Sequence, residues 1–361
     1  MNRQSFFHPS PPATRATAAA GPEHEERDQC REPVERRERL LVTGSTGYLG
    51  HYVTAQLRAA GRSFLELRSA PQSPRLDLRD AAAVRWFLTA ARPSTILHLA
   101  GFTGRTRRGA AQARDPGAAE RETRMFDEVN VEGTRNLLAV AGELGVERVV
   151  SIGSAAEYGV RGTAEPVDVQ EGVQPTTVYG RSKWRQTEVV WEQAQRWGFS
   201  ACVLRVFNLF GPQQPLGLVV PDLLARLQAA PNSDATPLML PAAHDVRDFV
   251  PVELVARAIV SLANRPSVSG IQHACSGAGV TILQVANWLA AEYDREQVWR
   301  VPDDARRPTF SVGVPSPIMR ELAMAEPVPS TFDLPLAWPL PLEQLIRRVA
   351  RLARQSAPQQ R

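Results

Sequence analysis

The sequence has almost no lysine and little cysteine. Lys and Arg together number 42, yet the only lysine is Lys183. The three cysteines, Cys30, Cys202 and Cys275, are odd in number and far apart, so they predict neither a disulfide framework nor a CxxC metal site. The six histidines show no metal-ligand spacing, and we expect no bound metal. The low cysteine content favours a reducing cytosol.

Long hydrophobic runs and a strong net charge are also missing. No stretch approaches the roughly 20 apolar residues that a membrane helix needs, so we expect no membrane association. The first twenty residues lack the apolar core of about 7–15 residues that marks a signal peptide, which predicts a cytoplasmic protein. The formal net charge is only +4 in 361 residues and no nucleic-acid-binding motif is visible, so we expect no nucleic-acid partner.

The pattern of apolar residues predicts an α/β fold. Residues 1–37 are rich in Pro, Ala, Arg and Glu without aliphatic periodicity, and they predict a disordered tail. From Arg39 onward, short apolar runs alternate with helical stretches. Strands are predicted near 39–44, 63–68, 94–101, 146–154 and 201–207, and helices near 48–60, 81–91, 127–144 and 178–197. This alternation is typical of a doubly wound, Rossmann-like parallel sheet.

The regular alternation of predicted strands and helices ends after Gly211. Proline-rich connections separate four further predicted helices, near 219–230, 252–263, 282–293 and 342–354. We predict a dinucleotide-binding, Rossmann-like domain over residues 38–207 that also receives about 245–275. Residues 208–244 and 276–361 are predicted to form a smaller C-terminal substrate-binding lobe. The arginine-rich segment 101–124 is interpreted as a solvated loop rather than a cover over the active site.

A glycine-rich turn follows the first predicted strand. In TGSTGYLG, Gly44, Gly47 and Gly50 permit a tight turn and close approach of a pyrophosphate to a helix N-terminus, which predicts dinucleotide binding. Arg68 ends the second strand, where an arginine accommodates the 2′-phosphate of NADP and an acidic residue selects NAD. Glu66 lies two residues too early. We therefore favour NADP, with NAD as the alternative and a merely solvated Arg68 as the other interpretation.

The segment VYGRSK predicts a catalytic pair. Residues four apart share a helix face, so Tyr179 and Lys183 can converge. A tyrosine, with a reference pKa near 10, needs a neighbouring cation to act as an acid–base group at neutral pH. The sole lysine stands four residues after one of only five tyrosines, which favours the functional interpretation.

Seven segments together resemble one enzyme family. In order they are TGSTGYLG, HLAG, NVEGT, SIGSAAEYG, YGRSK, RVFNLFGP and RDFV. Over about Leu40 to Arg300 the chain resembles extended short-chain dehydrogenases/reductases, the NAD(P)-dependent epimerase/dehydratase family. The resemblance implies an enzyme with a nicotinamide dinucleotide cofactor and a nucleotide-sugar substrate, assembled as a homodimer.

The resemblance also implies roles for single residues. Ser154 resembles the hydroxyl that hydrogen-bonds the reacting oxygen, Tyr179 the proton donor or acceptor, and Lys183 its partner. Asn208 resembles a substrate-pocket residue, and Arg247 resembles the arginine that clamps the diphosphate, a role suited to a bidentate guanidinium. The alternative interpretations of these last two are a capping amide and a surface ion pair.

Cofactor contacts are implied along the glycine-rich turn and at the strand ends. Asp77 and Leu78 of LDLRD resemble the pair that contacts adenine. The expected cofactor contacts are Gly44, Thr46, Gly47, Tyr48, Leu49, Gly50, Arg68, Asp77, Leu78, Leu99, Ala100, Gly101, Asn130, Tyr179, Lys183 and Phe207.

The segment after Ser154 narrows the reaction. Dehydratases of this family resemble one another in an Asp-Glu pair at the places of Ala155 and Ala156, so we do not expect dehydration; Glu157 comes one residue later and is not assigned that role. GSAAEYG and RVFNLFGP resemble reductases of nucleotide-linked 4-keto-6-deoxy sugars, such as the GDP-4-keto-6-deoxymannose reductase group. A 4-epimerase with tightly bound NAD is the alternative. A non-catalytic, cofactor-sensing relative would have lost the Tyr-Lys pair, which this chain keeps.

Overall fold

The fold is known for most of the chain beyond its first 38 residues. The computed structural model describes residues 39–67, 76–104, 117–230, 237–295, 298–303, 307–324 and 342–356. The predicted tail and Arg68 lie outside the described residues.

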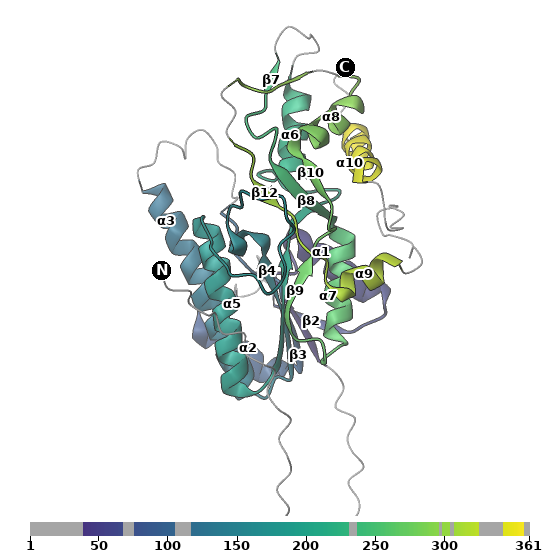
Figure 1. The fold of residues 1–361 in the computed structure, drawn as a ribbon. Coiled ribbons are helices and arrows are strands. Elements are labelled where there is room, and N and C mark those ends of the chain that lie inside the picture. Colours follow the sequence, from purple (N-terminus) through teal and green to yellow (C-terminus); the bar gives the residue numbers. More distant parts are fainter. Residues whose placement is uncertain are drawn as a thin grey trace, which may run out of the picture.

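A six-stranded parallel sheet forms the centre of the larger part of the molecule (Figure 1). Its strand order is β2-β1-β3-β4-β5-β9, so the chain starts in the middle and winds outward in both directions. Every residue of β1 and β3 is buried, as expected for parallel strands covered on both faces. The strands are β1 (Leu40–Thr43), β2 (Phe64–Leu67), β3 (Thr95–His98), β4 (Arg148–Ser154), β5 (Ser200–Val206) and β9 (Gly270–Ala274).

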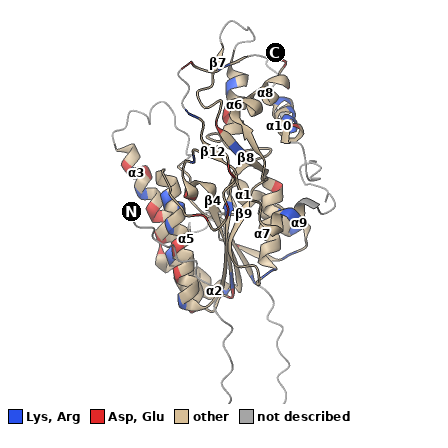
Figure 2. Cartoon of the chain, viewed as in Figure 1, with Lys and Arg blue, Asp and Glu red and all other residues tan. Residues whose placement is uncertain are grey.

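Helices cover both faces of this sheet. On one face α1 (Tyr48–Ala59) and α7 (Val252–Ala263) share a core with the strands. On the other face α2 (Ala81–Ala91), α4 (Gly133–Glu143) and α5 (Val178–Trp197) do the same. Acidic and basic residues are interspersed along the outer surface of α5 (Figure 2), as expected for its solvent-facing side.

The helix that leads into α4 begins earlier than predicted. α3 (Ala118–Met125) continues through the π-helix η2 (Phe126–Glu132) into α4. The interpretation of 101–124 as a loop is therefore wrong for residues 118–124. The arginines at 105–114 lie outside the described residues.

The smaller lobe packs three helices around small sheets (Figure 1). α6 (Val219–Ala229), α8 (Ile282–Ala291) and α10 (Leu342–Ser356) share one apolar core. β8 (Val246–Pro251) lies between β10 (Gly279–Thr281) and β12 (Phe310–Ser311) and also pairs with β6 (Asn208–Phe210). The remaining elements are β7 (Leu238–Met239), β11 (Trp299–Arg300), the 3₁₀ helix η3 (Ala155–Tyr158) and α9 (Pro317–Met324). The predicted fold class, a doubly wound parallel sheet with a smaller C-terminal lobe, is confirmed.

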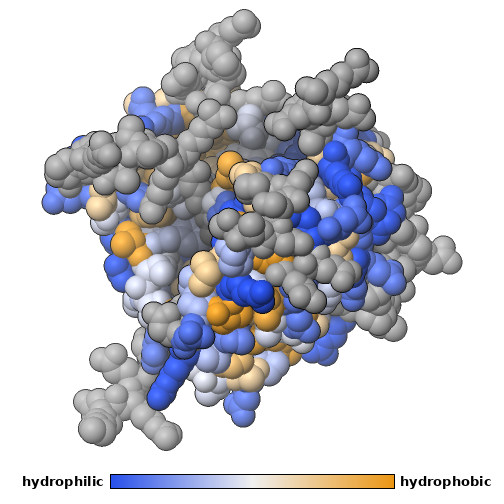
Figure 3. All heavy atoms as spheres, turned by 90° about the horizontal axis from the view of Figure 1, so that it is seen from above, coloured by the Kyte–Doolittle hydropathy of each residue, from blue (hydrophilic) through white to orange (hydrophobic). Residues whose placement is uncertain are grey.

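Few large apolar side chains are exposed among the described residues. Figure 3 shows one face, seen from above, on which hydrophilic residues surround scattered apolar ones. The described exposed large apolar residues are Leu65, Trp86, Val160, Leu216 and Met239. Within the described ranges, no helix is long and apolar enough to span a bilayer.

Candidate active site

The turn between β1 and α1 combines a glycine in the left-handed conformation with an uncapped helix start. Gly44 adopts a φ of +70°, which favours glycine, and the N–H of Gly47 donates to its carbonyl at 3.0 Å. Gly47 is the N-cap of α1 and has no side chain to bind the first N–H groups of the helix. Such a helix start suits an anion such as a phosphate.

Close packing pins this turn against the end of β3. A Cβ on Gly44 would lie 2.5 Å from the backbone nitrogen of Ala100, and a Cβ on Gly50 would overlap the carbonyl oxygen of Gly44. Gly47 has more room, with its nearest neighbour at 3.3 Å, and both it and Thr46 are exposed. The structure therefore brings the predicted contacts of the turn and of Leu99–Gly101 together, with the turn's outer rim open to a ligand.

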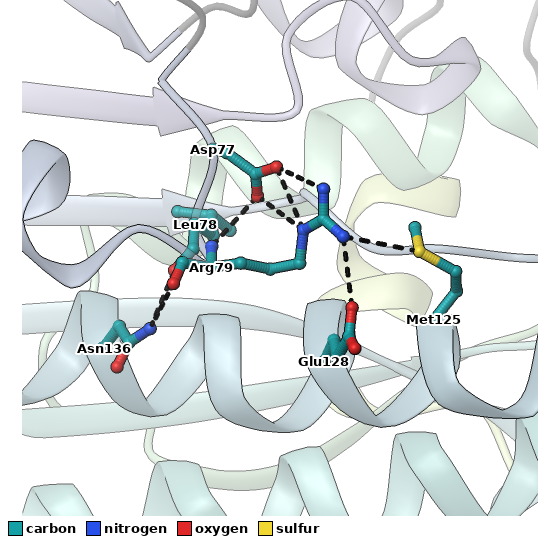
Figure 4. A network of polar contacts seen from close by, with 6 residues as sticks. All are labelled: Asp77, Leu78, Arg79, Met125, Glu128 and Asn136. Atoms are coloured by element: carbon teal, nitrogen blue, oxygen red, sulfur yellow. Dashed lines mark hydrogen bonds and ion pairs between the residues drawn. The ribbon is translucent and has the colours of Figure 1, made fainter. Parts of the chain in front are cut away.

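A charged network lies beside the predicted adenine contacts (Figure 4). The Arg79 guanidinium donates to the Asp77 carboxylate at 2.6 Å and holds its pKa below the usual range. Arg79 also donates to Glu128 at 3.1 Å, and Asn136 donates to the carbonyl of Leu78 at 3.0 Å. Arg79 was not identified from the sequence as part of this site, although it lies two residues after Asp77 in LDLRD, close enough to form an ion pair. An open hollow of about 570 Å³ is lined by Asp77, Arg79, Asp80, Glu128 and Glu132.

A glycine brings the predicted catalytic residues of two elements together. Ser154 is the last residue of β4, and Tyr179 lies in the first turn of α5. A Cβ on Gly180 would lie 3.1 Å from the carbonyl carbon of Ala156 and closer still to its oxygen. Only glycine at this position lets α5 approach the segment that follows Ser154 so closely.

Lys183 lies one turn further along α5 and is buried. Its ammonium donates to the carbonyl of Ile152 at 2.6 Å and to the side-chain oxygen of Gln186. Burial lowers the pKa of Lys183 to about 8, and the negative charge of Glu157 opposes this fall. Lys183 therefore carries its charge at neutral pH. The ammonium lies next to Ile152, near the end of β4.

Asn130 ties the segment after β3 to the catalytic helix. It lies in η2, and π-helical turns are rare and are frequent at functional sites. Its side chain accepts the N–H of Phe102 at 2.6 Å and donates to the hydroxyl of Ser182 at 3.0 Å. Ser182 in turn donates to the carbonyl of Tyr179 at 2.8 Å. The predicted Asn130 is thus linked to the catalytic helix through Ser182.

His98 is a buried link that sequence reasoning did not single out. Its Nδ1 lies 2.8 Å from the hydroxyl of Thr43 and its Nε2 lies 2.8 Å from that of Thr134. Because Thr134 donates to the carbonyl of Asn130, its oxygen accepts from Nε2. Burial, with the charge of Lys183, lowers the pKa of His98 to about 3, so the ring is neutral.

The predicted substrate contacts are already engaged within the chain. Asn208 donates to the carbonyl of Asp248 at 2.9 Å. The two terminal nitrogens of Arg247 donate to Asp245 at 3.0 Å and to the hydroxyl and carbonyl of Thr309 at 2.8 Å each. A diphosphate bound by Arg247 would have to replace these partners, so the clamp stays a prediction.

Phe207, a predicted cofactor contact, packs inside the protein. Its ring belongs to a small core with Tyr158 and Cys275 and meets the ring of His273 edge to face at 5.4 Å. Its role at the cofactor therefore also stays a prediction. Across the described residues, no three His, Cys, Asp or Glu side chains gather in a way that could hold a metal ion.

Comparison with protein families gives a match over most of the folded chain. Residues 40–274 match the model of the NAD dependent epimerase/dehydratase family. The dTDP-6-deoxy-L-talose 4-dehydrogenase (NAD(P)(+)) of Kitasatospora kifunensis is 27% identical over 265 residues, covering 70% of this chain and 79% of that protein. The dTDP-L-rhamnose 4-epimerase of Burkholderia thailandensis is 26% identical, covering 71% and 81%. The GDP-6-deoxy-D-mannose reductase of Pseudomonas aeruginosa is 26% identical, covering 74% and 84%.

Solved structures share the fold. The UDP-glucose 4-epimerase of Thermus thermophilus, in complex with NAD, superposes with a TM-score of 0.69 at 23% identity and covers 88% of this chain and all of its own. RMD from Pseudomonas aeruginosa, complexed with NADPH, superposes with a TM-score of 0.66 at 24% identity and covers 87% and 98%. At these identities the similarity shows the fold alone.

Proposed function

Because this chain belongs to the NAD dependent epimerase/dehydratase family, we propose that it reduces a nucleotide-linked 4-keto-6-deoxy sugar with NADPH. A nicotinamide dinucleotide, NAD or NADP, is typical of the family. The open rim of the β1–α1 turn and the uncapped start of α1 fit its pyrophosphate. When bound, the dinucleotide supplies the hydride.

Each catalytic side chain has one role in this reaction. Tyr179 donates its phenolic proton to the oxygen of the keto group as that oxygen gains negative charge. Ser154 donates a hydrogen bond to the same oxygen, and the buried ammonium of Lys183 favours the phenolate that remains. The close approach of the first turn of α5 to Ala156, two residues after Ser154 at the end of β4, is the observation that carries this proposal.

The side chains after Ser154 argue against dehydration. Ala155 and Ala156 offer no acid or base. The carboxylate of Glu157 is fully buried and bonded to Arg205, Thr187 and the N–H of Ser154, so it is held away from a substrate. Elimination of water, which needs an acid and a base at the sugar, finds neither in this segment.

The relatives support a 6-deoxy sugar and leave a second candidate. Two of them are named as a dehydrogenase and a reductase of 6-deoxy sugar nucleotides, and one structural neighbour is complexed with NADPH. A nucleotide-sugar 4-epimerase with tightly bound NAD is the alternative, because another relative is named a 4-epimerase and another neighbour is complexed with NAD. Asn208 and Arg247 are proposed to contact the substrate, in a homodimer in the cytoplasm.

A substrate panel separates these functions. The purified chain is incubated with nucleotide-linked 4-keto-6-deoxy sugars and, separately, with nucleotide hexoses, each with NADPH and with NADH. A reductase consumes one NADPH for each 4-keto sugar reduced. An epimerase interconverts the 4-hydroxyl isomers without net cofactor consumption, and NAD copurifies with it. Epimerisation, with no reduction of any 4-keto sugar, would replace the proposal with the alternative.

A further inference from the structure

Glu157 joins the elements that carry the catalytic residues. Its Oε1 accepts the backbone N–H of Ser154 at 2.8 Å, as part of a capping box at the start of η3. Its Oε2 accepts the hydroxyl of Thr187 at 3.1 Å. Thr187 lies on α5, one turn beyond Lys183, so one carboxylate bonds both to the end of β4 and to the catalytic helix.

A buried arginine holds this carboxylate in place. The side chain of Glu157 has no exposed surface, and Arg205 of β5 donates to its Oε2 at 2.8 Å. The guanidinium of Arg205 also lies 4.5 Å from the centre of the Tyr158 ring, whose hydroxyl bonds the ring of His273 at 2.6 Å. A buried charge pair with this many partners adopts one geometry, because losing either partner is costly.

The strand leaves room for the carboxylate at Gly153. Gly153 pairs with Arg205 across β4 and β5. A Cβ at this position would lie 2.7 Å from Oε1 of Glu157 and 3.0 Å from the side chain of Arg205. Only a residue without a Cβ at position 153 leaves space for the carboxylate of Glu157. The contact between this part of β4 and Glu157 therefore depends on both residues.

We propose that Glu157 is a positioning residue, which fixes the hydroxyl of Ser154 relative to Tyr179 and Lys183 by bonding both elements. This role rests on the proposed function for its effect on turnover. Its basis is that one side chain bonds both the N–H of Ser154 and the helix that carries Lys183.

The charge of Glu157 also acts on the buried ammonium. The ionisable groups coupled to Lys183 from other elements are neutral His98 of β3 and Glu157 of η3, whose charge Arg205 of β5 partly balances. Tyr179 lies one turn earlier on the same helix. Removing the negative charge leaves the positive charge of Arg205 nearby. The ammonium should then lose its proton at a lower pH.

The test compares three variants. Glu157→Gln keeps the shape and removes the charge. Thr187→Val removes only the bond to α5, and Thr187→Ser is its matched control because it keeps the hydroxyl. Each is measured for kcat and KM with the substrate found in the panel, for the Kd of NADPH by fluorescence, for its pH profile and for its melting temperature.

The proposal expects a loss of kcat with KM and Kd nearly constant. Glu157→Gln should lower kcat by roughly 10- to 100-fold and move the alkaline limb of the pH profile to lower pH. Thr187→Val should lower kcat by roughly 3- to 10-fold without moving that limb, and Thr187→Ser should stay within about 2-fold of the wild type. A folded Thr187→Val whose kcat matches the wild type would overturn the proposal, even if Glu157→Gln fails to fold.

A substrate-free measurement keeps the two proposals apart. Crystal structures of Thr187→Val and Thr187→Ser report the distance between the hydroxyls of Ser154 and Tyr179 without any substrate. That distance should change in Thr187→Val and stay as in the wild type in Thr187→Ser. If no sugar in the panel is turned over, the proposed function fails, while these structures still decide the role of Glu157; an unchanged distance in Thr187→Val would overturn it.

Discussion

Gly180→Ala should separate turnover from cofactor binding. The added methyl would lie closer than 3.0 Å to the backbone oxygen of Ala156, and real Cβ atoms essentially never come that close to another heavy atom. A backbone oxygen cannot rotate away from this contact. The first turn of α5 must therefore retreat from the segment after Ser154 by roughly 1 Å, and a misplacement of about that size can cost about 100-fold in rate. We expect kcat to fall by roughly 30- to 100-fold.

The free energy of unfolding of Gly180→Ala should fall only modestly. Alanine is about 1 kcal/mol better than glycine within a helix, whereas overpacking costs about 1–3 kcal/mol. The two effects partly offset, so we expect a net destabilisation of about 0–2 kcal/mol. Turnover with the panel substrate, the Kd of NADPH and chemical denaturation are the three measurements.

Two control variants test the geometric reasoning. Gly172→Ala has no neighbour within 4 Å and should behave as the wild type. Gly142→Ala produces a similar overlap, but with the side chain of Trp197 at the far end of α5. It should lower stability and leave kcat nearly unchanged. If Gly180→Ala keeps full kcat, or if Gly142→Ala loses as much, the close approach at Gly180 does not set the catalytic geometry.

Three further predictions concern the catalytic tyrosine, the cofactor and acid stability. Tyr179→Phe should lower kcat by roughly 10²–10⁴-fold with the melting temperature and cofactor Kd unchanged; normal turnover would remove Tyr179 from the mechanism. Arg68→Asp should weaken NADPH binding by roughly one to two decades and leave NADH nearly unaffected; a wild type that prefers NADH, with a ratio of kcat/KM insensitive to the change, would refute the NADP assignment. Burial lowers the pKa of His98 to about 3 and that of His273 to about 4, so the unfolded chain binds protons that the folded chain does not. Stability should therefore fall as the pH drops from about 6.5 toward 4, and a denaturation midpoint that stays level over this range would contradict the pKa values.

The alternating pattern of the sequence was sufficient to predict five of the six strands of the sheet. β1, β3, β4 and β5 are short apolar runs between amphipathic helices, and their hydrophobicity reflects burial on both faces. β9 was not predicted, because its segment GIQHA has no clear pattern of its own and joins the sheet edge by pairing with β5. The domain boundaries drawn around it stay a prediction.

α3 and η2 show where pattern reading fails. α3 buries none of its residues, so it has no apolar stripe from which a helix could be recognised. The π-helical turn that follows carries one more residue per turn than the α pattern assumes. The spacing of apolar residues therefore could not show that Asn130 lies opposite Ser182, although the likeness of NVEGT to its family placed Asn130 near the site.

The network around the catalytic pair could be predicted only in part. Tyr179 and Lys183 were evident from their spacing and from the single lysine. The bonds of Glu157 depend on which residues of β4, β5 and α5 become neighbours, and a sequence does not give that register. Arg205 looks like any other arginine in an arginine-rich chain until the pairing of β4 with β5 places it beside Gly153.

Two of the charged ligand contacts that the sequence predicts, Asp77 and Arg247, differ in what ligand binding would cost. Asp77 and Arg79 form an ion pair in which both side chains are about two-fifths exposed, and such a pair contributes about 0–1 kcal/mol, so adenine could replace Arg79 at small expense. Arg247 is bonded to the buried carboxylate of Asp245 and twice to Thr309, and hydrogen bonds to charged groups contribute about 1.5–3 kcal/mol each. A diphosphate at Arg247 must therefore either provide equal partners or bind beside it. The adenine contact thus costs one exposed ion pair, whereas a clamp by Arg247 costs several hydrogen bonds unless the diphosphate binds beside the existing partners.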